Sequence, residues 1–589
     1  MIETKRTLIN RGLNLLLSIF SVIAIPYVLP TSDNTVVSVA SIFLFLVAPI
    51  YYWYNYSLKK VEKRDFLFCI FPALFLSICL KMGRDLSLYG NLSYTLASII
   101  KNALIILAIS VLIYSVLIRL LKTNLDKIKT NVLEKSFSFF SLFCIFLIVW
   151  LPILMIFWPG IYTWDAAMQI SQLVNQQITA HHPIIHTLFL NIIILIGRLT
   201  GSYYLGAVIH TVFQMIVCVG VNSYICSRLS TFKLNKYVYY LILTFYLFFP
   251  INMLTSIYIT KDSLFSSFFF LLIFKLCEYY LLEKKELGRN KAIELIIIIV
   301  LVGLFRNNAI YALLATVPML FFIKRKKMRR NLIFVFCLGS ILTVAINQTL
   351  LTVTNAKPGM EGQMYSVPLQ QLARSYKNDP DSFTKKEKDE LFNYVPERNL
   401  DSYNPRISDY VKNGFTLRNK GSSTLDFLEL WVKIGLKNKA NYFDAFFMLT
   451  QGYWDTGLQF PDKYYRIPIV EIRSKDTAIF GNFNEKSWFP KVREKLIDGF
   501  YNNQSYKKLP ILSLCLTPGF TVWSFILLGL FSVYRGFRDS YFIFVFLIMY
   551  FGTILLGPVA LVRYIYPFML VLPVMFVFVS NKNLSKNNI

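Results

Sequence analysis

The chain has few charged residues and lacks the short motifs that mark the common soluble enzyme folds. Only 16% of its 589 residues are charged, which excludes an ordinary soluble protein of this size. No Walker sequence, GxSxG elbow or GxGxxG fingerprint stands in a suitable context, so phosphate-loop, hydrolase and dinucleotide sites are not indicated. The sequence also contains no visible internal repeat and no low-complexity tract.

Cysteine and histidine are too sparse for a disulfide framework or an obvious metal centre. Nearly all of the eight cysteines lie inside apolar runs, and none falls in the polar stretch 355–509. They form no CxxC pattern, so we read them as small core residues. His181, His182 and His186 lie close together, and His182 and His186 are four residues apart, but no third ligand at metal spacing stands near that pair, which argues against zinc. No cofactor is therefore assigned, and a divalent cation at Asp165 and Asp262 is left open.

Hydrophobic residues make up 55% of the chain and gather in about fifteen runs, most of them near 20 residues long. Such runs, separated by short basic loops, predict an all-α polytopic membrane protein. The net charge of +28 fits Lys and Arg on cytoplasmic loops beside anionic lipid headgroups. Membrane lipids are therefore expected partners, and nucleic acid is not.

The positions of the basic loops predict the topology. If segment 184–200 crossed the membrane, the basic loop 324–330 would face outward, against the positive-inside rule. We therefore expect 184–200 to lie in the outer interface, or to dip in and out. About fourteen transmembrane helices then remain, with both termini cytoplasmic. Segment 292–323 is too long for one crossing and predicts a hairpin broken at Arg306-Asn307-Asn308.

Composition suggests four regions along the chain. They are N-terminal transmembrane helices at 1–136, a membrane core at 137–354 with an outer loop at 158–202, a small extracytoplasmic insertion domain at 355–509, and C-terminal transmembrane helices at 510–589. The outer loop is expected to contain interfacial helices.

The outer loop contains one carboxylate, Asp165, directly after a long apolar run. Thr163 is a plausible N-cap, which places Asp165 in the first turn of a short amphipathic helix. Gln169, Gln172 and Gln176 then continue the polar face that Asp165 begins. A helix dipole favours the ionised carboxylate, and an ionised, positioned carboxylate suits a general base. The alternative is that Asp165 only caps the helix.

Polar groups interrupt the apolar pattern at the outer ends of four spans. These groups are Asp165, Lys261-Asp262, Arg306-Asn307-Asn308 and Arg563-Tyr564. Ionisable residues at membrane depth usually mark a site, and three cations near a carboxylate suit a phosphate-bearing substrate. Snorkelling at span ends is the alternative, but it predicts no preference for the outer side.

At these residues the chain resembles GT-C-type glycosyltransferases, the broad group of protein O-mannosyltransferases and the aminoarabinose transferase of lipid A. The matching pieces are Pro159-Gly160 with Asp165, His182-Pro183, Pro250 to Asp262, and Arg563-Tyr564 with Pro567. An uncharacterised bacterial branch of the group is the most similar. The resemblance covers about 137–350 and 511–580. Ala166 departs from the paired acids that the mannosyltransferases tend to have after the first loop carboxylate.

The resemblance implies an inverting glycosyltransferase at the outer face of the plasma membrane. A polyprenyl-phosphate sugar would be the donor, and a hydroxyl of an envelope glycan, glycolipid or protein the acceptor. Asp165 would be the base, and Arg563, Arg306 and Lys261 would hold the donor phosphate. Further substrate-binding residues would be Tyr162, Trp164, Gln169, His181, His182, Asp262, Asn307, Asn308 and Tyr564.

Three other classes remain open for such a chain. A flippase or transporter for lipid-linked saccharides would need polar residues through the bilayer midplane and a repeated half. A polymerase or ligase would use similar lipids on another fold. An assembly scaffold would not need the ionisable cluster.

Overall fold

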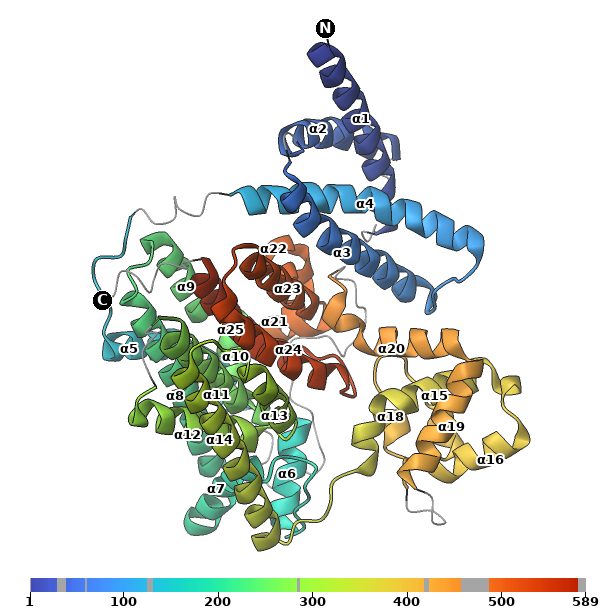
Figure 1. Cartoon of the computed structure of the whole chain (residues 1–589). Helices are drawn as coiled ribbons and strands as arrows, with labels where there is room; N and C mark the ends of the chain where they lie inside the picture. Colours follow the sequence, from blue (N-terminus) through green and yellow to red (C-terminus); the bar gives the residue numbers. More distant parts are fainter. Residues whose placement is uncertain are drawn as a thin grey trace. The chain divides into compact units, whose positions relative to one another are not determined.

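A computed structural model describes residues 2–28, 39–58, 61–123, 131–282, 287–417, 423–456 and 487–580 (Figure 1). The chain divides into two compact units. Unit 1 comprises Met1–Asn124 and Tyr365–Pro461, and unit 2 comprises Leu125–Met364 and Asp462–Ile589. The described residues are helical apart from short connections and one pair of two-residue strands, so the predicted helical fold class is confirmed.

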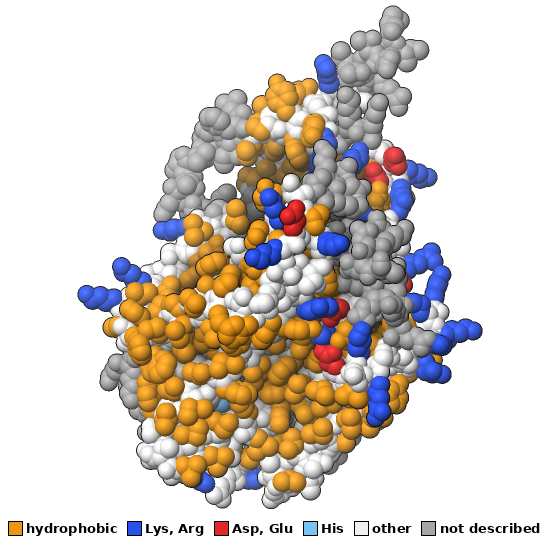
Figure 2. Space-filling view, turned by 90° about the vertical axis from the view of Figure 1, so that its left-hand side faces the viewer, with side chains coloured by type: hydrophobic (Ala, Val, Ile, Leu, Met, Phe, Trp, Pro, Cys, Tyr) orange, Lys and Arg blue, Asp and Glu red, His pale blue; other side chains and the backbone are white. Residues whose placement is uncertain are grey.

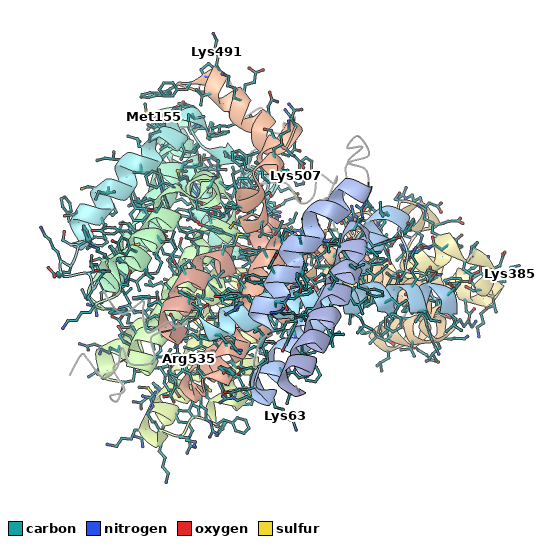
Figure 3. The ribbon with its side chains drawn as sticks, turned by 90° about the horizontal axis from the view of Figure 1, so that it is seen from above. Lys63, Met155, Lys385, Lys491, Lys507 and Arg535 are labelled. Atoms are coloured by element: carbon teal, nitrogen blue, oxygen red, sulfur yellow. The ribbon has the colours of Figure 1, made fainter. Side chains whose placement is uncertain are left out.

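Unit 1 combines N-terminal helices with a group of shorter helices from the middle of the chain. Its α-helices are α1 (Ile2–Ala24), α2 (Val39–Ser57), α3 (Lys63–Tyr89), α4 (Leu96–Lys122), α15 (Ser366–Asn378), α16 (Lys385–Tyr394), α17 (Glu397–Asp401), α18 (Asp409–Lys412), α19 (Thr424–Lys437) and α20 (Lys439–Trp454). The shorter helices share a core that includes Leu372, Tyr394, Phe427 and Ile434. Lys385 lies on this helical group, on α16 (Figure 3).

Buried polar contacts fasten the shorter helices to the α3–α4 turn inside unit 1. Asp444 accepts hydrogen bonds from the Tyr94 hydroxyl at 2.9 Å and from the backbone N–H of Leu92 at 3.4 Å. Arg374 donates to the carbonyl oxygen of Gly90 at 2.8 Å and pairs with Asp444 at 3.3 Å. The separate insertion domain at 355–509 stays a prediction, because 365–461 shares a unit with the N-terminal helices and 457–486 lies outside the described residues.

Unit 2 is a helical bundle with one short parallel strand pair. Its elements are α5 (Phe139–Ile156), β1 (Ile161–Tyr162), α6 (Trp164–Val174), α7 (Ile184–Thr200), α8 (Tyr203–Ser230), α9 (Lys236–Phe248), α10 (Pro250–Ile257), β2 (Tyr258–Ile259), α11 (Lys261–Leu276), α12 (Arg289–Phe305), α13 (Ala309–Leu320), α14 (Lys326–Val353), α21 (Pro490–Ile497), α22 (Pro510–Cys515), α23 (Pro518–Tyr534), α24 (Tyr541–Leu555) and α25 (Val562–Ser580). Trp488, just before α21, donates its backbone N–H to the carbonyl oxygen of Met155 near the end of α5.

The described residues include eight helices that are long and apolar enough to cross a membrane, or nine if the bent pair α9–α10 is one span. Hydrophobic side chains form a broad patch over the lower part of the view in Figure 2. Phe140 and Ile148 on α5, for example, are 72% and 71% exposed. Long apolar helices with exposed hydrophobic side chains are typical of a protein embedded in lipid. The predicted break at 306–308 is confirmed, because α12 ends at Phe305 and α13 begins at Ala309.

The bundle of unit 2 has two chemically different ends. At the basic end, residues beside the basic connections join helix ends: Arg228 bonds to Glu278, Arg325 to the carbonyl oxygen of Tyr280, and Arg535 to that of Ser580. At the site end lie the other ends of the same helices, with Lys261 at the start of α11 and Arg563 at the start of α25. The predicted outer polar groups therefore share one end, opposite the basic connections.

Helix α7 stays within the site end instead of running along the whole bundle. It packs antiparallel to the first part of α8. The Phe189 ring lies against the rings of His210 and Phe213, and Ile193 lies beside Gly206. Helix α8 therefore begins where α7 ends and runs back past it toward the basic end, where Arg228 lies. This geometry agrees with the prediction that segment 184–200 does not cross the membrane. The depth of that segment in the membrane stays a prediction.

Candidate functional site

Two parallel strands bring distant parts of the chain together. Ile161 pairs with Tyr258, and Tyr162 pairs with Ile259. Each strand is followed by a threonine N-cap residue and a helix, so the N-termini of α6 and α11 lie side by side. Helix N-termini favour negative charge because their first N–H groups have no partners within the helix. The strand pair therefore places Asp165 and Asp262, both in first turns, next to each other.

Gly160 allows strand β1 to pass close to α8. Its φ of 136° is a conformation that side chains rarely adopt, and a Cβ atom would lie 2.7 Å from the Thr211 hydroxyl oxygen. Thr163 then caps α6 by accepting a hydrogen bond from the N–H of Ala166, and its hydroxyl donates to the carbonyl oxygen of Ile259 at 3.0 Å. The predicted N-cap is confirmed, and the Pro-Gly turn has a physical reason.

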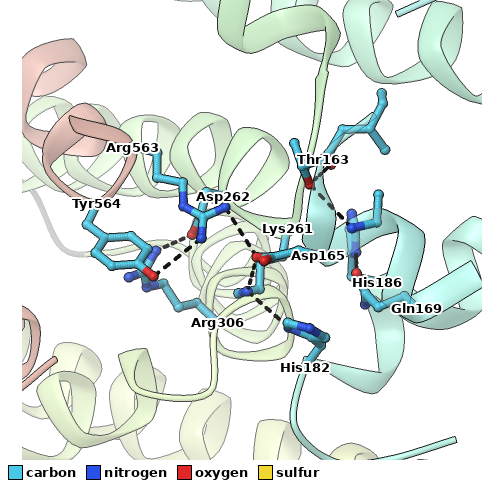
Figure 4. A network of polar contacts seen from close by, with 12 residues as sticks. Thr163, Asp165, Gln169, His182, His186, Lys261, Asp262, Arg306, Arg563 and Tyr564 are labelled. Atoms are coloured by element: carbon cyan, nitrogen blue, oxygen red, sulfur yellow. Dashed lines mark hydrogen bonds and ion pairs between the residues drawn. The ribbon is translucent and has the colours of Figure 1, made fainter. Parts of the chain in front are cut away.

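Asp165 forms ion pairs with two cations from different helices (Figure 4). Its Oδ2 lies 3.1 Å from Nζ of Lys261 and 3.2 Å from Nη1 of Arg563. Burial raises the pKa of Asp165, but the Arg563 and Lys261 cations outweigh it and hold that pKa well below its usual range. The carboxyl group is therefore ionised at neutral pH. The side chains of Asp165 and Arg563 are each 17% exposed, so the pair is reachable from outside the protein.

Behind this pair lies a second, less accessible ion pair. Asp262 accepts a hydrogen bond from Nη1 of Arg306, and its side chain is 2% exposed. Arg306 also donates to Asn308 at 3.0 Å and lies over the ring of Tyr564, 4.7 Å from its centroid. Arg563 joins the two pairs, because its Nε lies 3.6 Å from Oδ2 of Asp262. Two carboxylates and three cations thus leave the cluster with one excess positive charge.

His182 adds a neutral hydrogen-bonding group to the cluster. Burial and the nearby Lys261 lower the pKa of His182 to about 3, so the ring is neutral at pH 7. Lys261 can only donate, so His182 Nδ1 accepts its hydrogen bond at 3.2 Å and the ring proton is assigned to Nε2. Among the described residues, Nε2 of His182 has no hydrogen-bond partner although it is buried. A ligand oxygen would satisfy that N–H group.

Two of the predicted substrate-binding residues, Tyr162 and Gln169, are buried and bond to neighbouring helices outside the ionic cluster. Gln169 is 1% exposed; its Oε1 accepts a hydrogen bond from Nδ1 of His186 at 2.9 Å, and its Nε2 donates to the Thr187 hydroxyl at 2.8 Å. It therefore fastens α6 to α7. The Tyr162 hydroxyl donates to the carbonyl oxygen of Ala207 at 3.0 Å, on α8. Both side chains support the site from behind.

The remaining predicted residues lie around the cluster. Trp164 is 50% exposed beside Asp165, and Asn307 is exposed beside Arg306. The His181 ring lies 4.6 Å from that of His182, centroid to centroid. One detail of the predicted polar face is wrong: α6 ends at Val174, and Gln176 has a φ of 56°, so Gln176 does not continue the helix.

The site does not fit a divalent metal ion. Asp165 and Asp262 both face Lys or Arg side chains, and a divalent ion between them would lie beside the Arg563 cation. Among the described residues, no group of three or more His, Cys, Asp and Glu side chains could hold a metal ion.

The sequence contains a signal for the strand pair that the pattern analysis missed. The segments Ile161-Tyr-Thr-Trp-Asp165 and Tyr258-Ile-Thr-Lys-Asp262 both place an apolar pair before a threonine cap and an aspartate in the first helical turn. Strands of two residues are too short for hydrophobic periodicity to reveal. Gln214 was also missed: it donates to the carbonyl oxygens of Ser256 and Tyr258, and so holds β2 from the middle of α8.

Comparisons with known proteins identify a family but no characterised relative. No curated protein matches the chain, and no solved structure does. One family model, described as a family of unknown function (DUF6020), matches residues 174–588. That range is more than two thirds of the chain; it includes His182, Lys261, Asp262, Arg306 and Arg563 and begins after Asp165. The chain therefore belongs to the DUF6020 family of unknown function.

Proposed function

We propose that the chain is an integral membrane glycosyltransferase whose active site is the cluster around Asp165 at the site end of unit 2. It would move a sugar from a polyprenyl-phosphate donor to a hydroxyl group of an envelope glycan, glycolipid or protein. The excess positive charge of the cluster carries the proposal. A phosphodiester linking a lipid to a sugar bears one negative charge, which would balance the one excess cation.

The exposed members of the cluster receive the roles that need contact with substrate. Lys261 and Arg563 bind the donor phosphate, because they are partly exposed and belong to different helices. Arg306 is the least exposed of the three cations, at 9%, and its bonds to Asp262 and Asn308 make it the support that orients Arg563. His182 is the exception: its Nε2–H is buried, and it is assigned to an oxygen of the phosphate or the sugar because it has no hydrogen-bond partner among the described residues.

The reaction is an inverting displacement. Asp165 removes the proton of the acceptor hydroxyl while the acceptor oxygen bonds to the anomeric carbon. The bond from that carbon to the phosphate oxygen breaks, and its electron pair leaves with the lipid phosphate. Lys261 and Arg563 stabilise the charge that develops on the phosphate. No metal ion takes part in this scheme.

The same proposal includes a location and topology. The protein spans the plasma membrane with its site end outward and both termini in the cytoplasm, which puts the basic connections inside. About fourteen spans result when α9–α10 counts as one and α12, α13 and α23 are included beside α1 and α2. Helices α6 and α7 then lie in the outer interface, where a polyprenyl chain could enter beside the site.

Binding of a phosphate-bearing lipid tests the proposal. We expect the full-length protein in nanodiscs to bind a short-chain polyprenyl phosphate, measured by native mass spectrometry. Arg563→Gln should weaken that binding by about tenfold, since a hydrogen bond to a charged group contributes about 1.5–3 kcal/mol. Arg535→Gln is the matched control, because Arg535 lies beside the opposite end of α25.

Two results would contradict the proposal. One is equal binding of the polyprenyl phosphate and of the uncharged polyprenol, which would mean that no group of the protein binds the phosphate specifically. The other is equal weakening by Arg563→Gln and Arg535→Gln, which would place the effect outside the cluster.

A further inference from the structure

Both exposed cations of the cluster are already occupied by the carboxylate that is assigned as the base. Lys261 Nζ and Arg563 Nη1 contact the same oxygen of Asp165, at 3.1 and 3.2 Å. Arg306, the third cation, is held by Asp262 behind them. A donor phosphate that binds Lys261 and Arg563 must therefore compete with Asp165 for them.

This competition has a chemical consequence. A carboxylate that accepts hydrogen bonds from two cations is a weak base, because the cations stabilise its ionised form. In this state Asp165 would deprotonate neither water nor an acceptor hydroxyl efficiently. Once a phosphate anion has replaced the carboxylate at the two cations, Asp165 loses that stabilisation and gains a negative neighbour. Both changes make it a stronger base.

We propose that Asp165 is stored in its ion pairs with Lys261 and Arg563 and is released as a base only when a donor phosphate takes over both cations. The inference rests on the proposed function. It makes the site inactive toward acceptor and water until the donor is bound. Asp262 is not released, because its partner Arg306 is buried behind it.

The surroundings of Asp165 permit such a movement. The carboxylate stands in the first turn of α6, a short helix that is not among the membrane-spanning candidates. Its neighbour Trp164 is 50% exposed, so the described residues leave the outward side of this turn open, while Ala166 packs in the core on the other side. The titratable and charged groups that face Asp165 are Arg563 on α25, Lys261 on α11, Tyr258 on β2, and His182 and His186 around the start of α7.

The test compares affinities for a phosphodiester probe that does not titrate near neutral pH, a polyprenyl methyl phosphate. Removal of the competing carboxylate by Asp165→Asn should tighten binding by about tenfold while sugar transfer is lost. Glu294→Gln is the matched control, because it also removes an acid partner from a lysine of unit 2, Lys275 at the basic end. The control should bind as the wild type does.

The pH dependence gives a second readout. Release raises the pKa of Asp165 in the complex above its value in the free protein, so the complex binds the proton more tightly. Acidification should therefore strengthen probe binding to the wild type, and to His182→Asn, but not to Asp165→Asn.

The outcomes separate this inference from the proposed function. Equal affinity of the wild type and Asp165→Asn, with Arg563→Gln still weakened, would overturn the competition and leave the phosphate site standing. Binding no tighter than that of uncharged polyprenol in every variant would overturn the phosphate site itself. Tighter binding by Asp165→Asn and Glu294→Gln alike would reduce the effect to overall charge and also overturn the inference.

Discussion

Helix α11 has an ionic cluster at each end, and the two clusters differ in how completely they are satisfied. At the basic end, Lys275 pairs with Glu278 at 3.6 Å and with Glu294 at 2.8 Å, and Glu278 also accepts from Arg228 at 2.5 Å. These four side chains balance in charge, and the hydroxyls of Tyr224 and Tyr279 complete the hydrogen bonds of Lys275. The cluster has the properties of a structural clamp.

The cluster at the site end is incomplete by comparison. It has one cation more than it has carboxylates, and Nε2 of His182 is buried without a hydrogen-bond partner among the described residues. Buried polar atoms without partners are costly, so they persist where a ligand or solvent supplies the missing bond. Hydrogen-bond satisfaction therefore distinguishes the site from the clamp better than charge content does.

The largest expected effect concerns the side of the membrane on which each end lies. Asn307 and Lys324 are exposed and flank opposite ends of α13. In intact cells, a membrane-impermeant maleimide should label Asn307→Cys fully and Lys324→Cys only after permeabilisation. The wild type gives the background, since Cys144, Cys337 and Cys515 are only partly buried. If both variants were labelled in intact cells, both ends of α13 would face outside. The site end and the basic end of unit 2 would then not lie on opposite sides of the membrane.

The sequence predicted the helices and their polar ends better than it predicted the contacts between them. Basic loops and apolar length suffice to place Asp165, Lys261, Arg306 and Arg563 at one end, because lipid imposes the same rule on every span. The division of roles could not be predicted. Arg306 is buried against Asp262, whereas Arg563 reaches Asp165. This arrangement depends on strands β1 and β2, which contain only two residues each. The inward position of Gln169 likewise depends on how α7 packs against α6, which the polar face of an isolated helix does not reveal.

An effect of intermediate size should come from acid. All four histidines of the chain lie between His181 and His210, so histidine-dependent acid sensitivity belongs to the site end. His182 has a folded-state pKa of about 3, below the ordinary value of 6.5, so the unfolded chain takes up the proton first as pH falls. The stability that neutral His182 contributes is present above about pH 6.5 and decreases toward pH 3. Lowering the pH from 6.5 to 5 should cost roughly 2 kcal/mol.

Melting temperatures in nanodiscs across that pH range would measure this effect. His182→Asn should have a flatter pH dependence than the wild type, and the difference between them isolates His182 from the other histidines. Glu294→Gln, at the clamp, should keep the wild-type slope. Parallel curves for the wild type and His182→Asn would show that His182 is solvated, and the site end would then lack the buried neutral donor that sets it apart from the clamp.

The smallest expected effect tests the contact that keeps α7 at the site end. A Cβ atom at Gly206 would lie 2.7 Å from the carbonyl oxygen of Ile193, so Gly206→Ala must push α7 away from α8. Overpacking of this kind typically costs about 1–3 kcal/mol. Gly220 lies further along the same helix, with its nearest neighbour at 4.0 Å, so Gly220→Ala should be neutral or stabilise α8 by up to about 1 kcal/mol. Because α7 carries His186 against Gln169 of α6, Gly206→Ala should also weaken polyprenyl phosphate binding, whereas Gly220→Ala should not. Equal stability and equal binding of the two variants would mean that α7 does not rest on α8 as described, and the support of Asp165 from behind would have to come from another element.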